Sequence, residues 1–157
     1  MNNPSEHILK GILRNVEGDA TLPQGSNLKY LVQALPANGE YPKEGFASTL
    51  SSRWPKVSAE YRQYWRERYG KLRLGDIQPI QIQSDLVVVN MIAIDDDGVL
   101  NKDALKQCFA LVGKEVVANN SSVHMHVIED ESVNSLIESE LLKRGIGVTI
   151  YETPSDA

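Results

Sequence analysis

Two apolar runs dominate the hydrophobic pattern of the chain. Residues 29–35 (KYLVQAL) and 86–94 (LVVVNMIAI) are short and almost wholly apolar, which is typical of strands covered on both faces of a sheet. Pro36 follows the first run, and a proline cannot continue a central strand. Shorter runs predict further strands over residues 8–16, 78–83, 123–128 and 148–151.

Between these segments, apolar positions return every three or four residues. This spacing predicts helices over residues 46–52, 58–69, 101–117 and 132–144. The second of them places four aromatic rings on one face, interpreted as core packing: Tyr61, Tyr64, Trp65 and Tyr69. Asn101 and Gly145 are placed to cap a helix start and a helix end. Because strands and helices alternate, we expect a three-layer α/β domain with helices on both faces of a mixed, largely parallel central sheet.

A length of 157 residues predicts one domain over residues 1–157, with residues 153–157 as a flexible tail. The single cysteine, Cys108, belongs to an apolar helix face and is interpreted as core. No apolar run approaches the ~20 residues that span a bilayer, and the first thirty residues lack the pattern of a secretion signal. We therefore expect a cytoplasmic chain without a membrane partner.

The charge of the chain is unevenly distributed. Sixteen Lys and Arg against 21 Asp and Glu give a net charge of -5, which argues against nucleic-acid binding through the whole surface. Residues 53–73, in contrast, hold seven basic and two acidic residues, a net charge of +5. We interpret this stretch as the solvated face of a helix, with a local anion site as the alternative.

In sheets of this class, ligands bind beyond the carboxyl ends of the central strands, so the loops there are searched for chemistry. Asp19, between Gly18 and Ala20, could accept a hydrogen bond from the amine of a nucleobase, or could simply form a turn. The backbone amides of residues 38–46 could hold phosphates, although Glu40 and Glu44 would repel an anion.

Metal and nucleophile chemistry has little support. His124 and His126 point to one face of a strand and Glu129 follows, but this spacing fixes no third zinc ligand. Residues 95–98 (DDDG) are interpreted as an acidic turn rather than a cation site. No Ser-His-Asp order, P-loop, Cys-x-x-Cys or GxGxxG pattern occurs. We therefore expect no metal and no cofactor.

Several segments, in order, resemble a macro domain. The resemblance covers about residues 15–151 and rests on the order and spacing of these pieces: 16–21 (VEGDAT), 29–35, Gly45-Phe46, 53–55 (RWP), Tyr61-Arg62, 89–93 (VNMIA), 122–125 (SVHM), Leu136-Ile137 and 148–151. It implies a mixed sheet between helices and a cleft for ADP-ribose. Some members of that family also remove ADP-ribose from proteins or nucleic acids.

The resemblance also implies a set of ligand-binding residues. Asp19 matches the acidic residue that recognises adenine, and Gly45-Phe46 matches the end of the first glycine-rich ligand loop. Pro36 stands where that loop carries an asparagine often involved in catalysis, so nearby Asn38 becomes a weak catalytic candidate. The complete ligand-binding set expected is Asp19, Ala20, Asn38, Gly39, Gly45, Phe46 and Ile128.

The second ligand loop departs from the family. Members usually have a long glycine-rich loop after the fifth strand, whereas residues 125–132 (MHVIEDES) run directly into a helix without a glycine. Three acidic residues, 129–131, stand where the diphosphate would lie, and a unit charge ~4 Å from a phosphate costs about 4 kcal/mol at an effective dielectric of 20.

Two functions of different class follow. The first is a module that binds ADP-ribose or a related nucleotide metabolite, without a strong case for hydrolase activity. The alternative is a macro-like scaffold that has lost the ligand and contacts a protein partner through residues 53–73 or 129–131. A third reading is a smaller, less phosphorylated nucleoside in the remaining cleft.

Overall fold

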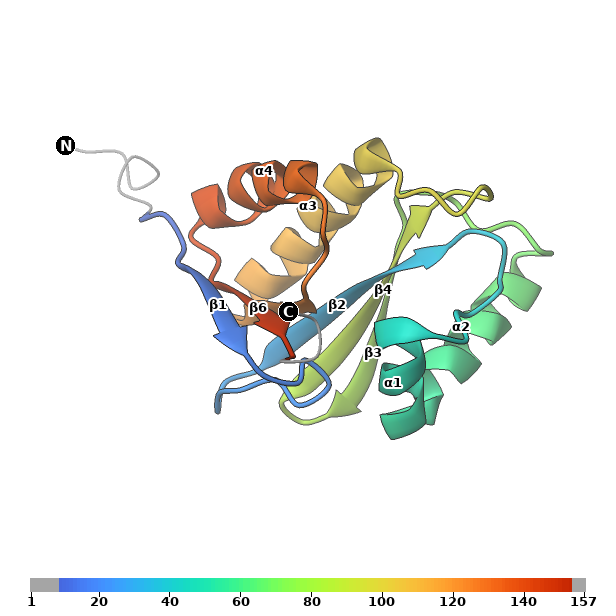
Figure 1. The fold of residues 1–157 in the computed structure, drawn as a ribbon, viewed down its shortest axis with the longest axis horizontal. Coiled ribbons are helices and arrows are strands. Elements are labelled where there is room, and N and C mark those ends of the chain that lie inside the picture. Colours follow the sequence, from blue (N-terminus) through green and yellow to red (C-terminus); the bar gives the residue numbers. More distant parts are fainter. Residues whose placement is uncertain (1–8, 154–157) are drawn as a thin grey trace.

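The computed structural model describes residues 9–153, which form a single six-stranded sheet between helices (Figure 1). The strands are β1 (Leu13–Glu17), β2 (Lys29–Pro36), β3 (Ile77–Gln83), β4 (Leu86–Ile94), β5 (Ser122–His126) and β6 (Val148–Glu152). Their order is β1-β6-β5-β2-β4-β3. Among the described strands, β3 alone runs antiparallel to its neighbour. The predicted mixed, largely parallel sheet is confirmed.

Helices cover the two faces of the sheet unequally. The helices α3 (Lys102–Ala118) and α4 (Glu131–Glu140) pack on one face, and α1 (Gly45–Arg53) and α2 (Pro55–Glu67) on the other. A 3₁₀ turn, η2 (Leu142–Arg144), follows α4. Figure 1 shows α1 and α2 beside the β2-β4-β3 half of the sheet, with β1 at the opposite edge, although Tyr151 of β6 belongs to the same core cluster as these helices. None of the described helices has the length and apolar character needed to cross a bilayer.

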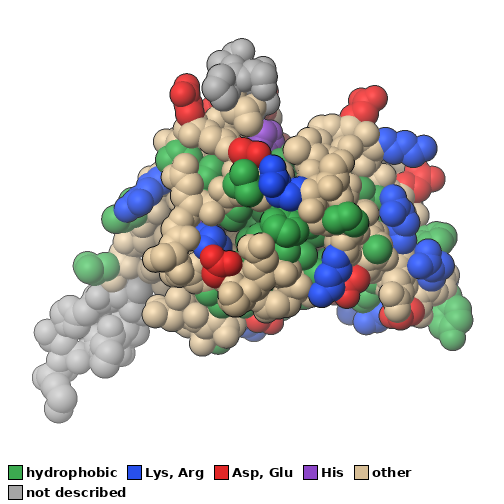
Figure 2. All heavy atoms as spheres, turned by 90° about the horizontal axis from the view of Figure 1, so that it is seen from below, with side chains coloured by type: hydrophobic (Ala, Val, Ile, Leu, Met, Phe, Trp, Pro, Cys, Tyr) green, Lys and Arg blue, Asp and Glu red, His purple; other side chains and the backbone are tan. Residues whose placement is uncertain are grey.

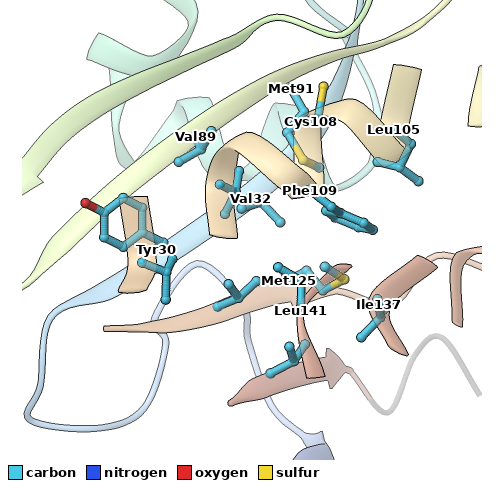
Figure 3. Packing of buried hydrophobic residues seen from close by; sticks show 14 of the residues in the cluster. Tyr30, Val32, Val89, Met91, Leu105, Cys108, Phe109, Met125, Ile137 and Leu141 are labelled. Atoms are coloured by element: carbon cyan, nitrogen blue, oxygen red, sulfur yellow. The ribbon is translucent and has the colours of Figure 1, made fainter. Parts of the chain in front are cut away.

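The larger core lies under α3 and α4 (Figure 3). Val32, Val89 and Met125 of the sheet face Leu105 and Phe109 of α3, and all five side chains are buried. Cys108 belongs to the same cluster, and burial raises the pKa of its thiol to about 12. Its interpretation as a core residue is confirmed.

The ends of several elements differ from the sequence prediction. The strand expected from residue 8 begins at Leu13, and residue 8 itself lies outside the described part of the chain. The helix expected over 58–69 begins at Pro55, whose missing N–H is harmless in a first turn, and ends at Glu67. Tyr69 therefore leaves the aromatic stripe: it has a φ of 55° and is 94% exposed, so its assignment to the core was wrong.

Both predicted cap residues lie at the end of a helical segment. Asn101 caps α3 by accepting a hydrogen bond from the backbone N–H of Ala104 at 2.9 Å. Gly145, with a φ of 80°, ends the 3₁₀ turn rather than α4, because the predicted helix over 132–144 breaks after Glu140. The tail expected over residues 153–157 lies outside the described residues except for Thr153.

The basic stretch follows the outer side of α2 and the segment after it. Arg62, Arg66, Arg68, Lys71 and Arg73 are all exposed. Figure 2 shows Lys and Arg side chains interspersed with Asp and Glu at this end of the molecule. Two of these guanidinium groups lie over tyrosine rings, Arg62 over Tyr41 and Arg68 over Tyr64. This arrangement agrees with a solvated helix face.

Two amides cross the centre of the sheet on the α1 and α2 side. Gln33 of β2 donates through Nε2 to Asn90 Oδ1 of β4 at 2.9 Å and to the Tyr41 hydroxyl at 3.1 Å. Asn90 donates in turn to Gln78 Oε1 of β3 at 3.1 Å. Gln33 and Asn90 are both buried, so this network holds polar groups that water cannot reach.

A second buried polar chain lies between β5 and β6. The ring nitrogens of His124 contact the hydroxyls of Ser122 and Tyr151, at 2.8 and 2.7 Å. His124 is 3% exposed. Burial, with a smaller contribution from the charge of Lys29, lowers the pKa of His124 to about 4, so the imidazole is neutral at physiological pH.

The two edge strands are short or interrupted. β1 has five residues, four of them exposed. β3 carries an exposed proline, Pro79, and its pairing with β4 shifts register between Gln81 and Gln83. A proline and a register shift both remove ladder hydrogen bonds, which is tolerated at an edge.

The amide network predicts a non-additive pair of substitutions. Asn90→Val removes the partners of Gln33 Nε2 and Gln78 Oε1, and leaving such groups unpaired in the core destabilises the protein by about 2 to 3 kcal/mol. Gln33→Leu with Asn90→Val removes both sides of the central bond, so the double variant should lose less stability than the two single variants added together. Urea unfolding of the four proteins measures this, and additive losses would contradict a coupled network.

The buried His124 predicts a loss of stability in acid. Its pKa is about 4 in the native state against 6.5 ordinarily, so between these values the unfolded chain binds a proton that the native state does not. The free energy of unfolding therefore decreases as the pH is lowered through this window. This effect of His124 is absent above pH 6.5 and reaches its full, constant size below pH 4. From pH 7.5 to pH 5 the wild type should lose about 2 kcal/mol more than His124→Gln, measured by urea unfolding. Equal losses would contradict a buried neutral imidazole.

Candidate functional site

A pocket of about 280 Å³ opens at the carboxyl ends of β2, β4 and β5, the edge at which the sequence predicts ligand binding. Its lining comes from β2, the start of α1, the segment after β4 and the segment after β5: Val32, Gln33, Ala34, Phe46, Ala47, Ile94, Gly98, Leu100, His126, Val127 and Ile128. Most of these side chains are apolar and none is Lys, Arg, Asp or Glu. The pocket thus suits an uncharged ring system better than a diphosphate.

One wall of the pocket is a stack of two rings. Phe46 of α1 lies parallel to His126 of β5, with ring centroids 5.0 Å apart and planes 4° apart. Phe46 takes this place because α1 begins at Gly45, whose φ of 76° turns the chain into the helix. No side chain caps the first turn of α1, and two residues of that turn, Phe46 and Ala47, line the pocket.

Gln33, one of the lining residues, carries a buried acceptor. The Oε1 atom of Gln33 is buried and has no hydrogen-bond partner among the described residues, although Gln33 Nε2 is fully engaged with Asn90 and Tyr41. Buried carbonyl oxygens of this kind are rare in native proteins. Gln33 lines the pocket, but its Oε1 is itself buried, so a ligand that donates an N–H or O–H would reach this oxygen only after the side chain moves.

Asp19 and Ala20 do not line this pocket. Asp19 Oδ1 accepts hydrogen bonds from the N–H and the hydroxyl of Thr21, at 2.9 and 2.7 Å, and thereby closes a turn after β1. Asp19 is exposed, and its Oδ2 has no hydrogen-bond partner among the described residues. Ala20 is 1% exposed and packs in the core under α1 and α2. Asp19 thus holds a turn and keeps one carboxylate oxygen without a described partner.

Asn38 and Gly39 are held by contacts within the protein. Asn38 Oδ1 accepts from the backbone N–H of Glu40 at 2.9 Å, which closes a turn. Gly39 has a φ of 79° and lies on the ring of Trp65, where a Cβ would come within 2.4 Å of the ring. Gly39 lines a separate, outer groove with Tyr41 and Arg62. These contacts give both residues a structural role.

Acidic residues flank the pocket where the family's second loop would lie. Four residues, 127–130, separate β5 from α4. The cap residue of α4, Asp130, accepts hydrogen bonds from the N–H and the hydroxyl of Ser132, at 3.0 and 2.6 Å. These hydrogen bonds lower the pKa of Asp130, so its negative charge persists into acid. On the other side, Asp95 Oδ1 accepts from the N–H groups of Asp97 and Val99, both at 3.2 Å, as expected of an acidic turn.

The structure therefore places only some of the predicted site residues at the pocket. Phe46 and Ile128 line the pocket, whereas Gly45 starts the helix that carries Phe46. Gln33 and His126 also line the pocket, although the sequence analysis did not include them in the ligand-binding set. Gln33 had a signal, since it is the polar residue inside an apolar run, as is Asn90. Nothing in the sequence pairs His126 with Phe46, because 80 residues separate them.

Solved structures similar to this one agree on the fold. The structure of a macrodomain protein from Streptomyces coelicolor matches with a TM-score of 0.84 and 29% identity, covering 90% of this chain and 99% of that one. A protein from Bacteroides thetaiotaomicron matches with a TM-score of 0.81 and 30% identity, covering 89% and 99%. The macrodomain of Thermus aquaticus DarG, 16% identical, matches in fold with a TM-score of 0.70, covering 90% and 99%.

Comparison by sequence adds no relative, since no protein-family model and no curated protein matches the chain. The structural likenesses nevertheless extend over nine tenths of the chain, at up to 30% identity. They agree with the six-stranded mixed sheet and its two helix layers. The chain is therefore a macro domain.

Proposed function

We propose that this macro domain binds ADP-ribose or a related nucleotide metabolite and does not hydrolyse it. The observation that carries the proposal is the pocket at the carboxyl ends of β2, β4 and β5, which combines a stacked-ring wall with a largely apolar, uncharged lining. A nucleoside offers the complementary feature, a flat ring.

The electrostatics of the pocket favour the nucleoside part of such a ligand over its phosphates. No Lys or Arg lines the pocket, and Glu129, Asp130 and Glu131 follow directly on its lining residue Ile128. The first turn of α1 has no side-chain cap, so its backbone N–H groups are able to donate hydrogen bonds to one phosphate. We therefore infer that adenosine retains much of the affinity of ADP-ribose.

The residues at the pocket supply little acid-base chemistry. His126 is the sole titratable side chain among the residues that line it, and Asn38 is engaged in its own turn. No carboxylate or lysine lines the pocket, which leaves His126 as the one lining side chain that could act as a general base. This scarcity of acid-base groups supports binding rather than turnover.

Phe46→Ala tests the ring wall. Removing the ring that stacks on His126 should weaken ADP-ribose binding about tenfold, equal to ~1.4 kcal/mol, measured by calorimetric titration with adenosine and NAD as comparators. Thr49→Ala is the matched control, since Thr49 lies exposed on the same helix and does not line the pocket. If the folded wild type gives no heat with any of the three compounds, the proposal of nucleotide binding is wrong. The alternative, a scaffold that contacts a protein partner, then replaces it.

Asp19→Asn tests the base contact without disturbing the turn. The amide keeps an oxygen for the two hydrogen bonds from Thr21 but replaces the partner-free Oδ2 with an N–H donor. If Asp19 accepts from the adenine amine, the substitution should weaken ADP-ribose binding by about 1 to 3 kcal/mol while the Tm stays close to that of the wild type. Unchanged affinity would show that the base binds elsewhere.

A further inference from the structure

A second hollow lies on the part of the sheet that α1 and α2 leave uncovered. It has a volume of about 460 Å³ and is lined by β1, β5, β6 and the segments that precede them. Because Ser122 begins β5 and Gly147 precedes β6, this groove lies toward the amino ends of these strands. The nucleotide pocket lies toward their carboxyl ends. The two sites are thus separate.

The strand register explains the shape of the groove. Arg14, Thr149 and His124 are register partners on β1, β6 and β5, so their side chains stand in one row on the same face. One level further toward the amino ends, Gly147 lies between Ile12 and Ser122 and has no side chain. A Cβ on Gly147 would have only Ile12 O within 4 Å, at 4.0 Å, so it would point into open space. The missing side chain forms part of the hollow.

The hydrogen bonds at the floor of the groove have a direction that can be assigned. The backbone N–H of Gln24 donates to the Tyr151 hydroxyl at 2.9 Å. The Tyr151 proton must then go to an acceptor, and His124 Nδ1, at 2.7 Å, is the acceptor that the described residues provide. His124 Nδ1 is therefore unprotonated, and in a neutral ring the proton lies on Nε2.

This assignment turns Ser122 into a donor toward the groove. Its oxygen accepts from His124 Nε2–H at 2.8 Å and from Asn27 Nδ2 at 3.1 Å. With the oxygen occupied by two donors, the Ser122 proton has no acceptor among the described residues. The pair is consequently not an activated nucleophile, because a serine nucleophile must donate to the histidine rather than accept from it.

The charged side chains that line the groove are all positive. Arg14 and Lys10 line it and no carboxylate does, although Lys10 also pairs with Glu138 at 2.5 Å. Arg14 forms no ion pair with a described residue. The buried ammonium of Lys29 holds the Gly25 and Asn27 carbonyls and is paired with Asp85 at 3.1 Å, which balances its charge. In a chain of net charge -5, the positive lining of the groove is a local reversal.

We propose that this groove is a binding site for a small anion, a carboxylate or phosphate group carried by a metabolite. The Ser122 hydroxyl and the Arg14 guanidinium donate to it, and the space above Gly147 admits it. The volume lies within the range of small-molecule sites, so the anionic group can carry an organic body.

The first test is the tautomer of His124 in the wild-type protein at pH 7.5. A long-range ¹H–¹⁵N spectrum of the imidazole should show a protonated Nε2 and an unprotonated Nδ1. The opposite tautomer would make Ser122 the donor to His124, would leave no hydroxyl proton for an anion, and would overturn the proposal.

The second test is titration with inorganic phosphate and with succinate at constant ionic strength, followed by amide chemical shifts and with sodium chloride as the blank. Both probes should produce saturable shifts at Arg14, Ser122 and Thr149. Arg14→Gln and Ser122→Ala should each weaken binding about tenfold. Arg66→Gln, which makes the same charge change on α2, should leave it unchanged.

Gly147→Val is the blocking variant, since its side chain fills the groove and a β-branched residue suits the strand that follows. Binding should be lost while the shifts of the nucleotide pocket stay in place. If this variant does not fold, Ser122→Ala carries the test. Shifts that grow linearly and match those of chloride, or that map to Phe46 and Ile128 instead, would overturn the proposal.

Discussion

The hydrogen bond between Gln33 and Asn90 is the contact on which the arrangement of one half of the molecule depends. It joins β2 to β4 in the middle of two apolar strands, where an unpaired amide would be costly. Each amide then reaches outward, Gln33 to Tyr41 in the loop before α1 and Asn90 to Gln78 on β3. Tyr41 donates to the Ala47 carbonyl at 2.6 Å, which positions the first turns of α1 over the end of the sheet. Through these contacts the network helps to position Phe46, which lines the pocket at the carboxyl ends of β2, β4 and β5.

The fold was largely predictable because its signals are local. The apolar runs that became β2 and β4, the cap at Asn101 and the alternation of strands and helices all lie within short windows. Tyr69 was misassigned because the helical spacing continues past Glu67, whereas the backbone turns to positive φ and ends the helix. Periodicity shows which residues would share a face, but not where the helix stops.

The site was less predictable because its contacts join distant parts of the chain. Phe46 and Ile128 were expected from the resemblance, yet the stack on His126 depends on how α1 meets β5. Asn38 and Gly39 were also expected from the resemblance, and the structure adds contacts within the protein: Asn38 Oδ1 accepts from the N–H of Glu40, and Gly39 lies on the ring of Trp65. Similarly, Tyr151 contacts His124 through the pairing of β5 with β6, which no local pattern indicates, whereas Ser122 lies two residues before His124 on β5 itself. Hydrogen-bond partners can be assigned only once the register is known.

The interrupted edges of the sheet also restrict how this protein can meet others. A free strand edge invites another chain to extend the sheet through its backbone, in an ordered complex or in an aggregate. Pro79 and the register shift in the pairing with β4 interrupt the regular strand at β3, and β1 offers only five residues. Neither edge offers a long continuous template for an added strand. Recognition by this domain is accordingly a matter of side chains and hollows, and its sheet is protected from end-to-end polymerisation.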